Sequence, residues 1–184
     1  MRLFLFFSVF GLCLGLETIY DFTVKNSEGN VVSMEKYRGK VVIFVNSASY
    51  CGYTRANYED LKMFEEKYHD KGLRVAVFPC NQFGQQEPDT LPEIKTFIRR
   101  TFSYQPEFYD KIHVNGPESS ELFEFLQKGG SSDITWNFWK FVVNRQGTVA
   151  ARFDHTVNPR DFESTVVGLL EEDEIGEEGD KLEL

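Results

Sequence analysis

The residues best suited to redox chemistry are two cysteines, Cys51 and Cys80, and Cys51 has the more suggestive position. Cys51 follows a run of β-branched and aromatic residues, Lys40 to Asn46, and precedes a helical pattern. A thiol at the N-terminus of a helix meets the positive end of the helix dipole and free backbone N–H groups, and both favour the thiolate. The thiolate is the nucleophile in thiol chemistry. Position alone leaves a reactive thiol and a buried structural cysteine equally open.

The other residues that carry chemistry point away from metal sites and disulfide scaffolds. The third cysteine, Cys13, lies in an N-terminal apolar segment, and the sequence has no CxxC pair and no cluster of histidines suited to zinc. The three histidines, His69, His113 and His155, have no signature of a cysteine protease around them, so we expect surface or turn residues.

Two buried strands and the helix between them must position Cys51. Lys40–Asn46 and Leu73–Phe78 are continuous apolar runs, typical of strands buried on both faces of a parallel sheet. The helix is predicted from about Tyr53 to His69, with Gly72 as its C-terminal cap. The resulting βαβ unit is expected to have a right-handed crossover, and sites in such sheets form beyond the carboxyl ends of the strands.

The rest of the chain predicts a single α/β domain. The order of elements is that of a thioredoxin-like fold, with a central mixed sheet flanked by helices. The remaining predicted elements are an extended segment at Tyr20–Val24, a turn at Ser27–Asn30 leading to Val31–Val32, a helix from about Thr90 to Thr101, a helix that begins at Ser119 or Ser120, a hairpin of Phe141–Asn144 and Thr148–Phe153, and a helix from Asn158-Pro159 to about Leu170.

Three separate segments resemble the active-site motifs of the glutathione peroxidase family. They are NSASYCGYT at Asn46–Thr54, FPCNQFGQQEP at Phe78–Pro88 and WNF at Trp136–Phe138. The resemblance is closest to the endoplasmic-reticulum members, types 7 and 8. It implies a monomeric, cysteine-containing peroxidase that serves the response to oxidative stress, without selenium or any other cofactor and with a thiol reductant as co-substrate.

The resemblance also implies a catalytic tetrad of Cys51, Gln86, Trp136 and Asn137. Gln86 and Asn137 carry amide N–H donors, and the Trp136 indole is a donor only. Donors aimed at sulfur stabilise a thiolate and orient a peroxide, and the product on Cys51 is a sulfenic acid. Without the resemblance, Trp136 is more often a core residue and Gln86 an ordinary loop residue.

The reductant that returns Cys51 to the thiolate stays open. Cys80 ends the strand that follows the Cys51 helix and is the candidate resolving thiol, although a small buried residue fits its motif equally well. Asp154–Thr156 occupies a region where the basic residues that hold glutathione would lie, and no convincing counterparts of those residues are found. The resemblance suggests a protein disulfide isomerase or glutathione as an external reductant. The alternative function is a non-catalytic luminal redox sensor or chaperone-docking module.

The two termini predict a location in the secretory pathway. Leu3–Leu16 is an apolar run after Arg2, too short for a comfortable membrane span and typical of a signal peptide over residues 1–16. The last four residues, Lys181–Leu184, resemble an endoplasmic-reticulum retention signal with Leu182 in place of Asp. We therefore expect the lumen of the endoplasmic reticulum, with secretion as the alternative, and no stable membrane insertion.

The net charge of −9 is concentrated at the C-terminus. Residues 171–184 hold eight acids and one base, and a tail of this composition is usually solvated and disordered. The domain itself, residues 17–170, is nearly neutral, which argues against binding to nucleic acid.

Overall fold

A five-stranded mixed sheet forms the centre of the domain. The computed structural model describes residues 17–130 and 133–180. The strand order is β5-β4-β3-β6-β7, in which β3 pairs in parallel with β4 and antiparallel with β6. The strands are β3 (Val41–Ser47), β4 (Leu73–Pro79), β5 (Glu107–Phe108), β6 (Lys140–Val143) and β7 (Val149–Phe153).

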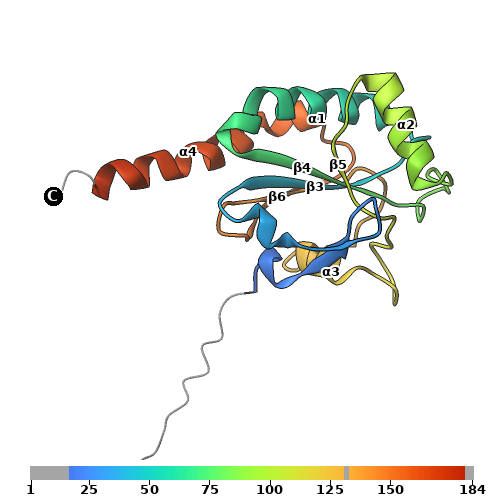
Figure 1. The fold of residues 1–184 in the computed structure, drawn as a ribbon, viewed down its shortest axis with the longest axis horizontal. Helices are drawn as coiled ribbons and strands as arrows, with labels where there is room; N and C mark the ends of the chain where they lie inside the picture. Colours follow the sequence, from blue (N-terminus) through green and yellow to red (C-terminus); the bar gives the residue numbers. More distant parts are fainter. Residues whose placement is uncertain (1–16, 131–132, 181–184) are drawn as a thin grey trace, which may run out of the picture.

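Helices cover both faces of this sheet (Figure 1). Helices α1, α2 and the beginning of α4 lie on one face, and α3 lies on the other. The helices are α1 (Thr54–Tyr68), α2 (Leu91–Phe102), α3 (Glu121–Gln127) and α4 (Glu163–Asp180). The predicted βαβ unit is confirmed as β3-α1-β4, and Gly72 closes it with a positive φ of 100°.

Alternation along β3 and β4 divides the buried side chains into two cores. Val41, Ile43 and Val45 face α1, whereas Val42 and Phe44 face α3, because successive side chains of a strand point to opposite faces. We call these the α1-side core and the α3-side core. Both are rich in aromatic rings, and every residue of β3 is buried between them.

The N-terminal part of the domain differs in detail from the expectation. Tyr20–Val24 was expected to be extended, but Ile19–Asp21 forms a 3₁₀ turn because Thr18 and Asp21 cap it reciprocally. Strand β1 (Thr23–Lys25) then pairs with β2 (Val31–Ser33), which confirms the predicted hairpin. Strand β5 was not predicted, since two residues are too few to leave a periodic pattern.

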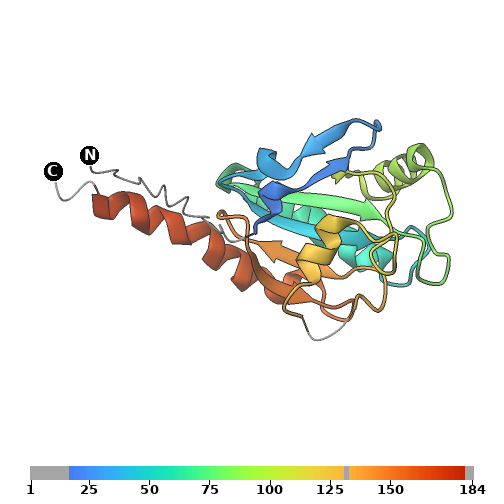
Figure 2. The same cartoon turned by 90° about the horizontal axis from the view of Figure 1, so that it is seen from below.

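The last helix is longer than the sequence suggested. It was expected to end near Leu170, with a disordered acidic tail beyond, but α4 continues to Asp180 and its later turns extend beyond the sheet (Figures 1 and 2). Val166 and Leu170 anchor the first turns in the α1-side core, and glutamate has a good helix propensity once a helix has begun.

The presumed signal peptide and the Lys181–Leu184 retention-like sequence lie outside the described residues. Among the described residues, none of the helices combines the length and the apolar character that a membrane span requires.

Candidate functional site

Cys51 lies between a buried strand and a helix, as predicted, within a turn over residues 48–53 that leads from β3 into α1. We call this the Cys51 turn. The Cys51 side chain is buried in the α1-side core with 9% of its surface exposed. The Cys51 amide donates to the Thr54 hydroxyl over 3.1 Å, and that hydroxyl donates to the Ala48 carbonyl over 2.7 Å. Thr54 therefore cross-links the turn from within. Thr54 is the last residue of the Asn46–Thr54 motif, but the motif alone did not indicate this role.

Asn46, in β3 just before the turn, connects this strand to the segment that carries Trp136 and Asn137. Its side-chain Nδ2 donates to the Trp136 carbonyl (3.1 Å), and its Oδ1 accepts from the Trp139 amide (2.9 Å). Its own carbonyl accepts from the Phe138 amide (2.6 Å). One fully buried side chain thus fixes a turn that lies 90 residues away in the sequence.

The segments held in this way contain strained backbone. Phe138 has a φ of 65° and Gln85 a φ of 53°, both in the left-handed region that residues with a Cβ seldom adopt. Such positions cost about 1–3 kcal/mol each and persist only where the surroundings determine them. Phe138 follows Asn137, and Gln85 precedes Gln86, so each strained residue adjoins a predicted site residue.

Gln86, Trp136 and Asn137 come together next to the Cys51 turn. The Gln86 carbonyl accepts from the Tyr50 amide (3.0 Å), and the Gln86 side-chain carbonyl accepts from Asn137 Nδ2 (3.0 Å). This hydrogen bond occupies the side-chain oxygen of Gln86, so the N–H₂ group of Gln86 is left to other acceptors. Trp136 packs against the α1-side core that contains Cys51. Tertiary structure therefore unites residues from three distant segments, and their catalytic roles stay a prediction.

Cys80 lies on the opposite face of the sheet from Cys51. Its side chain belongs to the α3-side core, is fully buried, and its thiol contacts the Gln82 side-chain carbonyl at 3.7 Å. Burial raises the pKa of the Cys80 thiol. Both thiols are free, and the Cys80 amide is bonded to the Ser47 carbonyl in the sheet. A direct Cys51–Cys80 bond would require the turn to leave this conformation.

Glu87 is a buried acid that the sequence analysis did not single out. Its exposed surface is 0%, and burial raises the pKa of its carboxyl to about 7, although Ser49 and Lys111 act in the opposite direction. Only its place directly after Gln86 could have drawn attention to it, because a glutamate in a Gln-Glu-Pro loop would normally be exposed.

Lys140 is a second buried charge near this end of the molecule. Its ammonium donates to the Asp154 carbonyl (2.9 Å), and burial lowers the pKa of Lys140 to about 7. This contact holds the loop that brings the His155 ring to 5.2 Å from the Tyr53 ring. His69 and His113 are exposed, in agreement with the expectation for surface residues.

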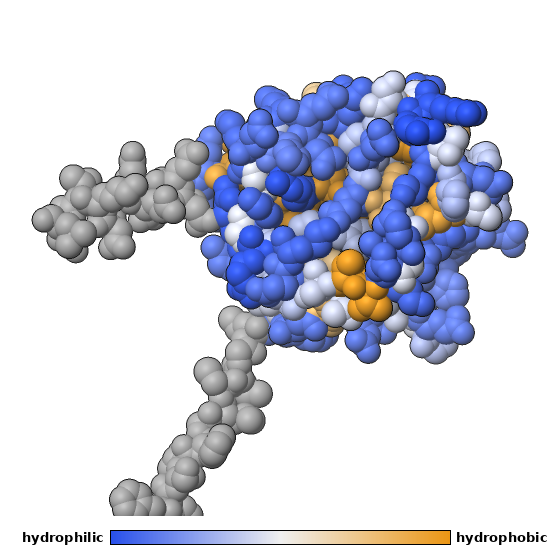
Figure 3. Space-filling model, in the orientation of Figure 1, coloured by the Kyte–Doolittle hydropathy of each residue, from blue (hydrophilic) through white to orange (hydrophobic). Residues whose placement is uncertain are grey.

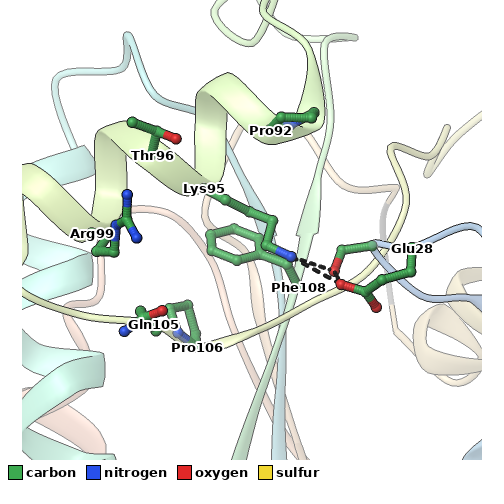
Figure 4. A pocket seen from close by; sticks show the side chains of 9 residues that line it. Glu28, Pro92, Lys95, Thr96, Arg99, Gln105, Pro106 and Phe108 are labelled. Atoms are coloured by element: carbon green, nitrogen blue, oxygen red, sulfur yellow. Dashed lines mark hydrogen bonds and ion pairs between the residues drawn. The ribbon is translucent and has the colours of Figure 1, made fainter.

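The surface offers a separate pocket between α2 and β5 (Figure 4). It has a volume of about 420 Å³, and its walls include Lys95, Arg99 and Phe108 but none of the four predicted site residues. Lys95 is engaged by Ser27 and Glu28 across its mouth. The molecular face in Figure 3 is largely hydrophilic with small apolar patches between the polar side chains.

Replacing Asn46 by alanine is expected to destabilise the protein by about 1–3 kcal/mol, because the Trp136 carbonyl and Trp139 amide lose a buried partner. Urea unfolding followed by tryptophan fluorescence measures this loss. The exposed Asn30 is the matched control, and Asn30→Ala should change the free energy of unfolding by less than about 0.5 kcal/mol. Equal effects of the two substitutions would contradict this role of the Asn46 side chain.

Comparison with known proteins connects this site to an enzyme family. The model of the family described as glutathione peroxidase matches residues 19–127. Glutathione peroxidase 1 of Caenorhabditis elegans is 45% identical over 161 residues, covering 85% of this chain and 99% of the relative. A probable phospholipid hydroperoxide glutathione peroxidase of Nicotiana sylvestris is 44% identical over 158 residues, covering 84% of this chain and 94% of the relative.

Solved structures agree with the sequence relatives. The crystal structure of T. cruzi GPX1 aligns with a TM-score of 0.69 at 30% identity, covering 84% of this chain and 97% of that chain. A thioredoxin-family thiol:disulfide interchange protein of Chlorobium tepidum shares the fold with a TM-score of 0.61 at 19% identity, covering 81% of this chain and 92% of that chain. The predicted thioredoxin-like fold is confirmed. The chain belongs to the glutathione peroxidase family and is a peroxidase.

Proposed function

We propose that the protein reduces peroxides with the Cys51 thiolate and passes through a sulfenic acid. The observation that carries this proposal is the continuous set of hydrogen bonds from the Cys51 turn to two amide side chains, Tyr50 to Gln86 and Gln86 to Asn137. Amide donors held beside a thiol can stabilise a thiolate and the oxygen that leaves it.

The chemical step needs only these groups and the peroxide. The Cys51 sulfur attacks the nearer peroxide oxygen, an S–O bond forms and the O–O bond breaks. The departing oxygen takes up from solvent the equivalent of the proton that the Cys51 thiol released, and leaves as water or an alcohol. Gln86 and the Trp136 indole are proposed to donate hydrogen bonds to the sulfur and to the departing oxygen, which costs no reorganisation when the donors are fixed beforehand. Asn137 Nδ2 donates to the side-chain carbonyl of Gln86 and to the Phe83 carbonyl, so Asn137 is proposed to act by orienting Gln86. A thiol then attacks the sulfenic sulfur, releases water and leaves a disulfide.

We propose hydrogen peroxide as a substrate, with organic and lipid hydroperoxides as further candidates. Two tobacco relatives are named as probable phospholipid hydroperoxide glutathione peroxidases, which supports a bulky hydroperoxide. Tyr50 supports it as well, since this exposed aromatic residue precedes Cys51 and stacks on Phe97 of α2.

Stopped-flow oxidation of the reduced protein by hydrogen peroxide tests the proposal. Cys51→Ser should abolish the fast phase, and Gln86→Ala should slow it by about 100-fold, the usual cost of removing one fixed donor. Met63→Leu, on the exposed side of α1, is the control and should leave the rate unchanged. A wild-type rate no faster than that of free cysteine would overturn the proposal.

We propose that an external thiol, glutathione or a protein of the disulfide isomerase type, resolves the sulfenic acid. The position of Cys80 on the other face of the sheet supports an external reductant. Direct resolution by Cys80 remains the alternative within the chain and requires the Cys51 turn to unfold.

Cys80→Ser should therefore change turnover with a saturating external thiol by less than about twofold, because Cys80 contributes no step when the reductant comes from outside. Steady-state peroxide consumption measures turnover, and mass spectrometry of the oxidised wild type identifies its disulfide. Loss of turnover in Cys80→Ser together with a Cys51–Cys80 disulfide in the wild type would instead assign resolution to Cys80.

We also propose that the protein acts in the lumen of the endoplasmic reticulum, where it would supply oxidising equivalents for disulfide formation. The apolar residues 3–16 and the sequence of residues 181–184 support this location. Two plant relatives are named as chloroplastic and mitochondrial, so the family occupies several compartments.

Deleting Lys181–Leu184 should raise the secreted fraction several-fold, because a retention receptor reads the terminal four residues. Immunoblots of medium and cells measure that fraction. Deletion of four tail residues further inside, Glu174–Glu177, is the matched control. An unchanged secreted fraction after the terminal deletion would contradict retention by this sequence.

A further inference from the structure

The backbone of Glu87 is fixed by hydrogen bonds at both its amide and its carbonyl. The Glu87 amide donates to the Asn81 side-chain carbonyl (2.9 Å), and the Glu87 carbonyl accepts from the Lys111 ammonium (2.6 Å). The carboxyl group is completely buried, and neither of its oxygens has a partner with ordinary hydrogen-bond geometry. A buried polar group without a partner loses its hydration, so an acid in such a place lowers the stability of the fold. Its presence here therefore suggests a role other than stability.

Ser49 of the Cys51 turn lies beside this carboxyl. Ser49 supplies a hydroxyl and a backbone amide close enough to act as donors to Glu87. The hydroxyls of Ser47, Ser49 and Tyr58 are also buried without a partner of ordinary geometry. We call Ser47, Ser49, Tyr58 and Glu87 the buried polar cluster. Ser49 belongs to the Cys51 turn and Ser47 directly precedes it, so the state of the carboxyl bears on how the turn is held.

The charge of Glu87 affects the pKa values of several neighbouring groups. It raises the pKa of Tyr50, which precedes Cys51, as a smaller contribution after the Asp89 hydrogen bond. It also contributes to the raised pKa values of Tyr58 and Cys80, for which burial is the main cause. Lys111 attracts the carboxylate and Asp89 repels it. A negative charge here therefore opposes a second negative charge nearby.

Resting on the proposed thiolate chemistry, we propose that Glu87 is a positioning residue for Cys51: as a neutral acid it holds the Cys51 turn through Ser49, and a negative charge on Glu87 opposes thiolate formation. Glu87 does not touch the peroxide and acts through the turn. The raised pKa of about 7 places the loss of the Glu87 proton within the physiological range.

Three single-site variants separate the two parts of the proposal. Glu87→Gln keeps a neutral hydrogen-bonding group, whereas Glu87→Ala removes the group altogether. The matched control is Glu65→Gln, since Glu65 on α1 is another carboxyl whose pKa burial raises, but it bonds Tyr104 rather than the Cys51 turn. All are made in a Cys13→Ser/Cys80→Ser background, so that Cys51 is the only thiol.

The first measurement follows the ultraviolet absorbance of the Cys51 thiolate against pH and needs no peroxide. Glu87→Gln should match the parent at about pH 5.5 and reach half-ionisation at a lower pH than the parent, because the opposing charge is gone. The stopped-flow rate with hydrogen peroxide should likewise be about fivefold or more above the parent at about pH 8. Glu87→Ala should be slower by about tenfold at all pH values, since a displaced turn is costly in rate.

Stability supplies a second readout. The pKa of Glu87 is raised above its unfolded value of 4.5, so the folded state binds the proton more tightly. Its contribution is therefore most favourable below about pH 4.5 and is lost as the pH rises through about 7. The melting temperature of Glu87→Gln should therefore rise relative to that of the parent over this pH range. The melting temperature of Glu65→Gln is the control, which separates an effect at the Cys51 turn from the general effect of neutralising a buried carboxyl.

The results that overturn the inference differ from those that overturn the peroxidase mechanism. Thiolate and rate profiles of Glu87→Gln that follow the parent at every pH, or a folded Glu87→Ala as fast as the parent, would remove Glu87 from the mechanism. Equal shifts in Glu65→Gln would do the same. A parent protein that shows the predicted thiolate shift but oxidises no faster than free cysteine would leave Glu87 in place and defeat the proposed function alone.

Discussion

The buried Asn46 side chain is the constraint on which the site depends. It is the last inward-facing amide of the central strand before the Cys51 turn, and it holds both the carbonyl of Trp136 and the amide of Trp139. The parallel pairing of β3 and β4 fixes Asn46, and Asn46 fixes a turn in which Phe138 is strained. The position of Asn137, and through it that of Gln86, follows from this connection.

The same end of the sheet holds several buried polar groups. Two buried strands with continuous apolar faces provide the rigidity, and the unpartnered hydroxyls and the Glu87 carboxyl lie just beyond their carboxyl ends. A closely packed core can hold a few polar groups that lower its stability, where the surrounding backbone leaves them no other conformation. Strain and buried polarity therefore occur together where the chemistry is proposed.

Much of the fold could be predicted because long elements leave strong patterns. The runs at Lys40–Asn46 and Leu73–Phe78, the helix between them and the hairpin at Gln146-Gly147 all appear in the structure close to the predicted bounds. The two-residue strand β5 and the extension of α4 to Asp180 were missed, since pairing partners and helix continuation depend on tertiary contacts that no local pattern records.

The site was predictable only as far as motifs reach. Cys51 was singled out by its position between a strand and a helix, whereas Gln86, Trp136 and Asn137 came from resemblance. The structure places the segments of all four together. Asn46, Thr54 and Glu87 stand in the same motifs, but their roles depend on burial and on partners distant in the sequence. The face of the sheet on which Cys80 lies required the register of β4, because a shift of one residue would move its side chain to the other core.

Because the sheet separates Cys51 from Cys80, an oxidised Cys51 would have a prolonged lifetime before it is reduced. Among the described residues, no second thiol lies on the same face as Cys51. In the proposed mechanism, a sulfenic acid on Cys51 would therefore persist until a reductant arrives, and another peroxide molecule would compete for the same sulfur during that interval. Sulfenic acid that loses this competition becomes sulfinic acid, which thiols do not reverse. In the proposed mechanism, the lifetime of the active protein under heavy peroxide exposure therefore depends on the local supply of reductant. Inactivation of the protein would then indicate that this supply is exhausted.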